Sequence, residues 1–169
     1  MTYQTPTNLL GFLLKWTAKC QSKNLKEQYK SGVRYFDIRL YVSKNHVKFA
    51  HGLVNYGSFY DSEVLNILAK KGVKFRLILE KGNKEKFKKI VEGLLDNGWG
   101  DQIHYIVDDK KSWNVMWMNP NVLLITKDYY PTYPKDGTIP YPKKHNKKYD
   151  IVFNDWEDDK NKVVLYDFV

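Results

Sequence analysis

Hydrophobic residues recur along the chain with two spacings, one typical of helices and one typical of strands. The helical spacing predicts helices at residues 8–16, 22–31, 61–71 and 84–96. The last is the clearest, because Asn83 precedes it as an N-cap and its apolar residues form one stripe, made of Phe87, Ile90, Val91, Leu94 and Leu95. Alternation of apolar and polar residues predicts strands at 33–42, 46–51, 74–80, 103–107, 121–126, 149–154 and 163–168.

The segments between these elements contain turn residues. Ser22 is the expected N-cap of the second helix, and Gly52 and Gly57 predict a loop after the strand at 46–51. Residues 129–148 are rich in Pro, Tyr and Lys and predict a long loop, and loops of this length are typically functional or mobile.

The order of strands and helices in the middle of the chain favours an α/β fold with parallel strands. Few helices separate the later strands, which favours an irregular barrel over a doubly wound sheet. A complete eight-unit barrel takes about 250 residues, whereas this chain has 169. We therefore expect a small, irregular or incomplete TIM-type (β/α) barrel, formed as one domain over residues 1–169.

One strand carries charged residues on a single face. In residues 33–42, Asp37 and Arg39 alternate with apolar residues, so both are expected to point into the barrel. Burying an unpaired charge is costly, so the two should pair with each other or with a ligand. His51 ends the next strand and precedes Gly52, which places it near that pair. The spacing alone favours a plain structural ion pair within the strand, because such pairs are common.

A resemblance to a known family rests on the same residues. Residues 32–40 (GVRYFDIRL) resemble the core motif of the phosphatidylinositol-specific phospholipase C X-domain family. Ala50-His51-Gly52 follows at the spacing of that family's second histidine motif, and residues 16–28 resemble its helical lead-in. The strong likeness covers roughly residues 12–60, about a third of the chain.

The resemblance implies a phosphodiesterase. Enzymes of this family cleave their substrate by attack of its own hydroxyl on phosphorus, with one histidine as general base and a second as general acid. Carried over, His51 is the general acid, Arg39 stabilises the phosphate, and Asp37 hydrogen-bonds to Arg39 or to the substrate hydroxyl. An arginine in the Asp-x-Arg motif marks the bacterial-type, metal-independent branch.

Weaker likeness extends to later segments. It implies that Glu80 and Lys127 contact substrate and that Asp167, on the last strand, supports the first catalytic histidine. Tyr129 opens the Tyr-rich loop, which is expected either to bind an inositol or lipid headgroup or to pack against the barrel. Glu80 stands where the metal-independent branch carries a basic residue, so a weak divalent-cation site at Asp37 and Glu80 is an alternative to a site without metal.

The family's general-base histidine has no counterpart in this chain, because no histidine precedes His46. We therefore expect a domain that is truncated at its N-terminus. Two readings stay open: a phosphodiesterase of this type, and a catalytically inactive relative that binds a phosphorylated headgroup or is structural.

Composition bears on partners. The net charge of +9 is compatible with anionic partners such as a phosphodiester, phosphatidylinositol or an anionic membrane surface, and equally with a solvated lysine-rich surface that has no specific partner. A nucleic-acid-binding protein is a lesser alternative, since the lysines are scattered and no motif supports it. The single cysteine excludes an internal disulfide. We expect a monomer without signal peptide or transmembrane segment, and nothing in the sequence assigns a location.

Overall fold

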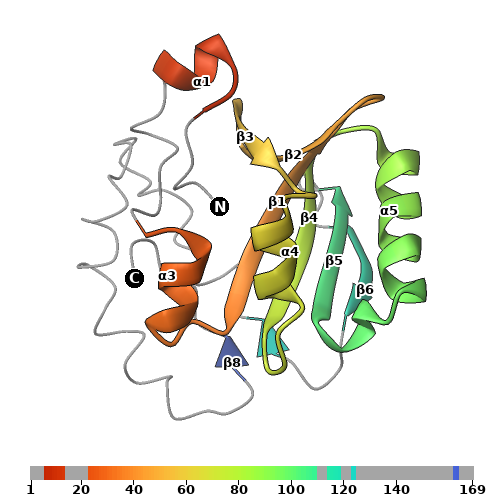
Figure 1. The fold of residues 1–169 in the computed structure, drawn as a ribbon. Coiled ribbons are helices and arrows are strands. Elements are labelled where there is room, and N and C mark those ends of the chain that lie inside the picture. Colours follow the sequence, from red (N-terminus) through yellow and green to blue (C-terminus); the bar gives the residue numbers. More distant parts are fainter. Residues whose placement is uncertain (1–5, 14–22, 110–113, 119–122, 125–161, 164–169) are drawn as a thin grey trace, which may run out of the picture.

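The computed structural model describes residues 6–13, 23–109, 114–118, 123–124 and 162–163. Their main feature is a mixed, open sheet of six strands in the order β3-β2-β1-β4-β5-β6 (Figure 1). Its strands are β1 (Tyr35–Val42), β2 (Val47–His51), β3 (Val54–Ser58), β4 (Lys74–Gly82), β5 (Ile103–Asp109) and β6 (Asn114–Met118). Two short strands, β7 (Leu123–Leu124) and β8 (Lys162–Val163), pair separately in parallel.

The barrel expectation is wrong. A barrel needs its sheet to close on itself, whereas this sheet ends at β3 on one side and at β6 on the other. Only the centre is parallel, where β4 pairs with β1 and β5. The outer pairs β1–β2, β2–β3 and β5–β6 are antiparallel. Direct antiparallel connections need no covering helix, so the α/β alternation of the middle does not continue around a ring.

Four helices belong to the described residues: α1 (Leu9–Leu13), α3 (Leu25–Lys30), α4 (Ser62–Leu68) and α5 (Lys84–Asp96). A single 3₁₀ turn, η1 (Trp99–Asp101), follows α5. The prediction of α5 is confirmed, including its cap, because the Asn83 side chain accepts a hydrogen bond from the N–H of Lys86. The cap of α3 is Asn24 rather than Ser22, since Asn24 and Glu27 form a reciprocal capping box.

Two strands were missed. Residues 54–58 form β3 where Gly52 and Gly57 predicted a loop, and Val54 and Tyr56 are its buried residues. Residues 114–118 form β6, which had no predicted counterpart. Of the predicted strand at 121–126 only β7 is described. The strand at 149–154 and the loop at 129–148 lie outside the described residues.

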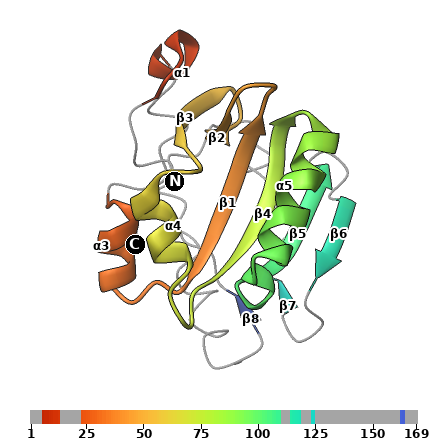
Figure 2. The same ribbon diagram turned by 45° about the vertical axis from the view of Figure 1, so that its right-hand side comes forward.

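The hydrophobic core lies on one face of the sheet. Alternate residues of β1 and β4 supply Phe36, Ile38, Leu40, Phe75, Leu77 and Leu79, all buried. They cluster with Val64 and Leu68 of α4 and with Phe87 and Val91 of α5. Both helices therefore cover this face; in Figure 2, α5 lies in front of β4 and β5, and α4 lies beside β1. The charged residues of β1 consequently lie on the opposite face.

Among the described residues, no helix combines the length and the apolar character that a membrane crossing requires.

Candidate functional site

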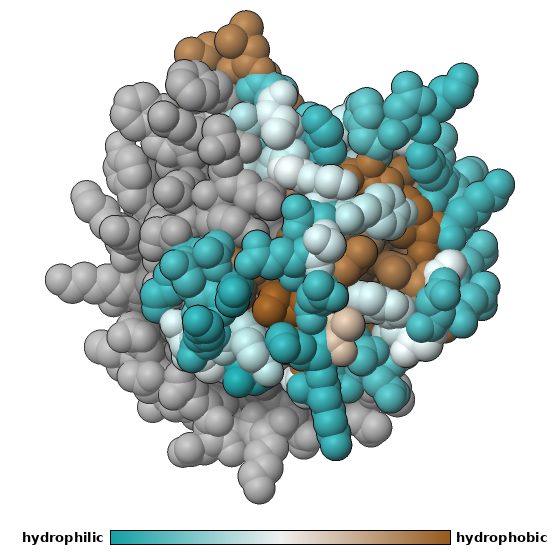
Figure 3. Space-filling model, viewed as in Figure 1, coloured by the Kyte–Doolittle hydropathy of each residue, from teal (hydrophilic) through white to brown (hydrophobic). Residues whose placement is uncertain are grey.

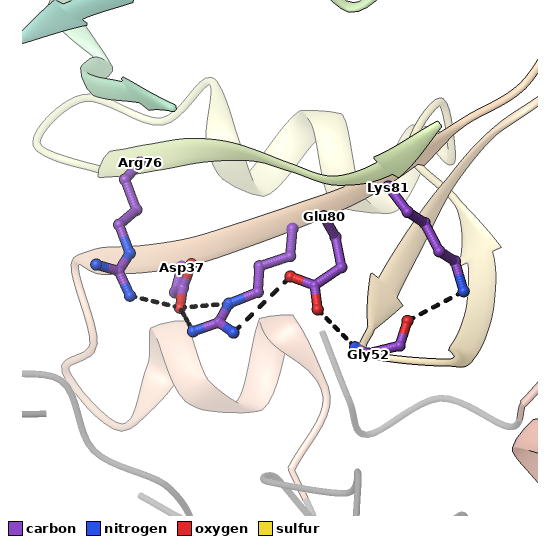
Figure 4. A network of polar contacts seen from close by, with 6 residues as sticks. Asp37, Gly52, Arg76, Glu80 and Lys81 are labelled. Carbon is purple, nitrogen blue, oxygen red and sulfur yellow. Dashed lines mark hydrogen bonds and ion pairs between the residues drawn. The ribbon is translucent and has the colours of Figure 1, made fainter. Parts of the chain in front are cut away.

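The site is built around the carboxylate of Asp37. Its Oδ2 accepts hydrogen bonds from Nε and Nη2 of Arg39, at 3.0 and 2.9 Å. The same oxygen accepts a third, from Nη2 of Arg76 at 2.8 Å (Figure 4). Arg76 is fully buried, and the side chains of Arg39 and Asp37 are 14% and 20% exposed. One carboxylate oxygen therefore holds two guanidinium groups in a largely water-excluded place.

The strand register brings these groups together. β1 and β4 are parallel neighbours, and Asp37 lies directly beside Arg76. Residues in register on neighbouring strands share a face, and residues two apart on one strand also share it. Asp37, Arg39 and Arg76 therefore meet on the face opposite the core. The expectation that Asp37 and Arg39 pair with each other is confirmed.

Two opposing effects act on Asp37. Burial by itself raises the pKa of its carboxyl group, but the positive charges of Arg39 and Arg76 and their hydrogen bonds more than offset this. The result is a pKa far below the ordinary value of 3.8, so Asp37 is ionised at neutral pH. Its second oxygen, Oδ1, is buried and has no hydrogen-bond partner in the described part of the chain. That oxygen can accept a hydrogen bond from a further donor.

A second acidic residue extends the cluster along β4. The side chain of Glu80 is only 2% exposed, and its Oε2 lies 3.9 Å from Nη1 of Arg39. Its other oxygen, Oε1, accepts a hydrogen bond of 2.6 Å from the backbone N–H of Gly52. The next residue, Lys81, donates from Nζ to the carbonyl oxygen of the same glycine at 3.0 Å. Figure 4 shows both side chains reaching from β4 to the Gly52 turn.

An irregularity in the strand pairing makes this double contact possible. The register of β1 with β4 shifts after Leu40, so that Tyr41 lies beside Lys81 and Glu80 is the extra residue. A bulge of this kind re-aims the side chains around it. Two consecutive residues of β4, Glu80 and Lys81, thus contact one glycine, which regular alternation would not allow.

His51 is placed through its neighbour. β2 pairs with β1 from Val47 to Phe49 and with β3 from Lys48 to His51, where His51 lies opposite Val54. His51 is half-buried and immediately precedes Gly52, the residue that Glu80 and Lys81 hold. The backbone of His51 therefore lies at the edge of the charged cluster.

The other described histidines lie in different surroundings. His46 is exposed, in the turn between β1 and β2, where its N–H donates to Oγ of Ser43. His104 is buried on β5, with its ring centre 5.9 Å from that of Tyr35. Burial, together with the charge of Lys74, lowers the pKa of His104, so this histidine is neutral at pH 7.

The structure thus brings together Asp37, Arg39 and Glu80 and places His51 beside them. Lys127, Tyr129 and Asp167, the other expected site residues, lie outside the described residues. Sequence reasoning missed Arg76 and Lys81. Arg76 had a signal, since it alternates with Phe75 and Leu77 and shares the face of Asp37. Lys81 had no such signal in the sequence, because the direction of its side chain depends on the bulge in β4.

Cationic side chains outnumber carboxylates in this cluster. No group of three or more His, Cys, Asp or Glu side chains that could hold a metal occurs in the described part. The two carboxylates of the cluster, on Asp37 and Glu80, both face the guanidinium of Arg39. Three cationic side chains, Arg39, Arg76 and Lys81, surround them, and arginine offers a planar pair of donors that matches phosphate oxygens.

Comparisons of the chain with protein-family models, with curated proteins and with solved structures found no match.

Proposed function

We propose that this chain binds a phosphodiester at Arg39 and cleaves it by attack of the substrate's own hydroxyl, with His51 as general acid. The observation that supports this most is the fixed guanidinium of Arg39. Nε and Nη2 of this guanidinium donate to Asp37, and its Nη1 lies near the carboxylate of Glu80. The same carboxylate accepts a hydrogen bond from the N–H of Gly52, in the turn after His51. The likeness of residues 32–40 and 50–52 to phosphatidylinositol-specific phospholipase C gives the reaction class.

Each group of the cluster has a role in this reaction. Nη1 of Arg39 is 3.9 Å from Glu80, longer than a hydrogen bond, so a phosphate oxygen can compete for this side. A cation placed there stabilises the charge that develops on phosphate. Oδ1 of Asp37 can accept a hydrogen bond from the attacking hydroxyl and so orient it. As the hydroxyl oxygen bonds to phosphorus its proton passes to solvent water, and the bond from phosphorus to the leaving alcohol breaks. His51 donates a proton to the leaving alcohol.

A second candidate shares the same site without turnover. Among the described histidines only His51 lies beside the cluster, whereas the resembled enzymes use a second histidine as general base. This favours a protein that binds a phosphorylated headgroup and does not cleave it. Both candidates require Arg39 for binding, and they differ only in whether the bound diester is hydrolysed.

A lipid is the favoured source of the phosphodiester. The chain has a net charge of +9, which attracts an anionic membrane surface. Leu9 and Leu13 of α1 are 82% and 62% exposed, and Leu53, next to Gly52, is 61% exposed. α1 is joined to that turn, since Nδ2 of Asn8 donates to the carbonyl oxygen of Leu53. Figure 3 shows α1 as an apolar protrusion at the top of the molecule.

The test combines binding and turnover. Inorganic phosphate is titrated by calorimetry, and hydrolysis of phosphatidylinositol and glycerophosphoinositol is followed with and without chelator. Arg39→Ala should weaken phosphate binding by about tenfold or more, because it removes a charge-assisted contact worth roughly 1.5–3 kcal/mol. His51→Ala should keep phosphate binding and lower turnover by about 10²–10⁴-fold.

Arg34→Ala is the matched control, because Arg34 is an exposed arginine that bonds the carbonyl oxygen of Tyr29 and stacks on its ring, outside the cluster. It should bind phosphate as the unaltered chain does. Equal phosphate affinity in Arg39→Ala and the unaltered chain would refute the proposed site. Binding without hydrolysis of either substrate would leave the headgroup-binding candidate.

A further inference from the structure

We propose that Glu80 is a positioning residue that sets the placement of His51 through the backbone of Gly52 and that its charge, beside Arg39, opposes phosphate binding. This inference rests on the proposed function, since it assigns Arg39 to the phosphate and His51 to the leaving group.

The two carboxylate oxygens of Glu80 face different partners. Oε1 accepts the short hydrogen bond from the N–H of Gly52, and Oε2 lies 3.9 Å from the guanidinium of Arg39. The side chain is 2% exposed, so water contributes little to its solvation. A buried carboxylate is stabilised mainly by such partners, and its hydrogen bond to a backbone N–H is of the strong, charge-assisted kind. Glu80 therefore has a structural reason to keep both contacts.

The turn is held from both of its backbone polar groups. The N–H of Gly52 donates to the carboxylate of Glu80, and the carbonyl oxygen of Gly52 accepts from the ammonium group of Lys81. The bulge in β4 brings these two neighbouring side chains to the same glycine. Gly52 has a φ of +56°, in the left-handed region, so its peptide groups are turned relative to those of a regular strand. Because His51 is covalently bonded to Gly52, these two hydrogen bonds to Gly52 also fix the position of the His51 backbone.

The same carboxylate is expected to weaken phosphate binding at Arg39. A phosphate oxygen that approaches Nη1 of Arg39 must displace Glu80 or lie close to its negative charge. Glu80 thus has two separable effects: its acceptor oxygen holds the His51 turn, and its charge weakens the binding of an anion. Glutamine keeps an acceptor oxygen but not the charge, whereas alanine keeps neither.

The two substitutions therefore have different expected results. Glu80→Gln should tighten inorganic phosphate binding by about tenfold while keeping the Gly52 N–H protected from hydrogen exchange. Its kcat should stay within a few-fold of that of the unaltered chain. Glu80→Ala should tighten phosphate similarly but expose the Gly52 N–H. Its kcat should fall by about 10²-fold, which is the effect of misplacing a catalytic group by about 1 Å.

The readouts are phosphate affinity by calorimetry, exchange of the Gly52 amide by NMR, and kcat and KM on glycerophosphoinositol. If the role of Glu80 were merely structural, kcat and amide protection would fall in both variants in proportion to their loss of stability, and neither variant would bind phosphate more tightly. If Glu80→Ala and Glu80→Gln leave the Gly52 amide equally protected, or if Glu80→Gln weakens phosphate binding, the proposal is wrong. The Glu80→Gln result decides it even if Glu80→Ala does not fold.

Arg39→Ala, measured in the same series, separates this proposal from the proposed function. If Arg39→Ala binds phosphate unchanged, the proposed function fails, and with it the effect of Glu80 on phosphate binding. The difference in Gly52 exchange between the two Glu80 variants would then report only a structural clamp. If Arg39→Ala abolishes binding but the Glu80 variants behave alike, the proposed function survives and the positioning role is refuted.

Discussion

The carboxylate of Asp37 shows how a single residue ties stability to pH. Its pKa is lowered in the folded chain, because the charges of Arg39 and Arg76 outweigh the cost of burial. In the unfolded chain the carboxyl group has its ordinary value of 3.8. The unfolded state therefore binds the proton more readily at low pH. The stabilising contribution of Asp37 is fully present above about pH 4–5 and is lost progressively as the pH falls below 3.8 toward the folded value.

Replacing Asp37 by asparagine tests this relation. At pH 7 the substitution should lower the free energy of unfolding by about 3 kcal/mol, because it leaves two guanidinium groups without their shared anion. The difference between the two proteins should shrink between pH 4 and pH 3. Urea denaturation at several pH values measures it.

Asp96→Asn, at the exposed end of α5, is the control for the Asp37 substitution and should change stability by less than about 0.5 kcal/mol. A difference between Asp37→Asn and the unaltered chain that stays constant from pH 7 to pH 3 would argue against the electrostatic account.

Residue patterns in the sequence anticipated part of this site. Strict alternation put Asp37 and Arg39 on one face of β1, and period-two alternation survives tertiary packing because each face has one environment. The partner strand was harder to read, because pairing of β1 with β4 depends on contacts between residues about 40 positions apart in sequence. Arg76 therefore remained unassigned, although its own strand was predicted.

At the scale of elements, the end of β4 shows where local geometry overrides pattern. Gly82 lies beside Val42 of β1 and has a φ of +113°. A Cβ at this position would overlap the carbonyl oxygen of Val42, which also accepts a hydrogen bond from the N–H of Asn83. Glycine is thus required twice, for its backbone conformation and for its lack of a side chain. It allows β4 to end beside β1 and the chain to enter α5.

Gly82→Ala should consequently destabilise the chain strongly, by about 3 kcal/mol or more, since both a strained φ and a steric overlap must be accommodated. Gly72→Ala is the matched control: its φ is +81°, but no atom lies within 4 Å of a Cβ built there. It should cost only about 1 kcal/mol, from the left-handed conformation alone. Thermal denaturation followed by circular dichroism compares them, and equal melting temperatures would contradict the steric argument.

Elements differed in how well the sequence predicted them, for physical reasons. α5 was correct to the residue because cap, stripe and length all act locally. β3 was missed because Gly52 and Gly57 favour turns, whereas antiparallel pairing with β2 and burial of Val54 and Tyr56 hold the segment extended. The barrel was predicted by extending the parallel centre outward, and strand directions at a sheet edge are not encoded in local periodicity.

At the scale of the whole molecule, the two faces of the sheet differ in character. One face is covered by α4 and α5 and supplies the core, and the other carries the charged cluster. The apolar protrusion of α1 is joined to the turn beside the cluster, because Nδ2 of Asn8 donates to the carbonyl oxygen of Leu53. Gly11 allows this close approach, since a Cβ there would crowd Val54. Two lysines border the protrusion: Lys48 donates to Thr7 and Lys81 to Gly52.

Apolar residues bordered by ammonium groups are suited to an anionic lipid surface, where leucines insert into the headgroup region and lysines meet phosphate. The double variant Leu9→Asn with Leu53→Asn should therefore bind vesicles of phosphatidylcholine and phosphatidylinositol about tenfold more weakly or worse, since each leucine contributes roughly 1–2 kcal/mol when partly inserted. Its melting temperature should barely change, because both side chains are mostly exposed already. Co-sedimentation with the vesicles at 50 and 500 mM salt measures binding.

Leu95→Asn provides the comparison for this vesicle experiment, since Leu95 is 38% exposed on α5, which covers the opposite face of the sheet from the cluster. If lipid contacts the α1 protrusion, Leu95→Asn binds normally, and high salt weakens the unaltered chain by screening the lysines. Phosphate affinity in solution should be the same in all three proteins, because the leucines do not touch Arg39. Weaker vesicle binding in Leu95→Asn, or normal binding in the double variant, would mean that the phosphodiester reaches Arg39 from solution rather than from a lipid surface.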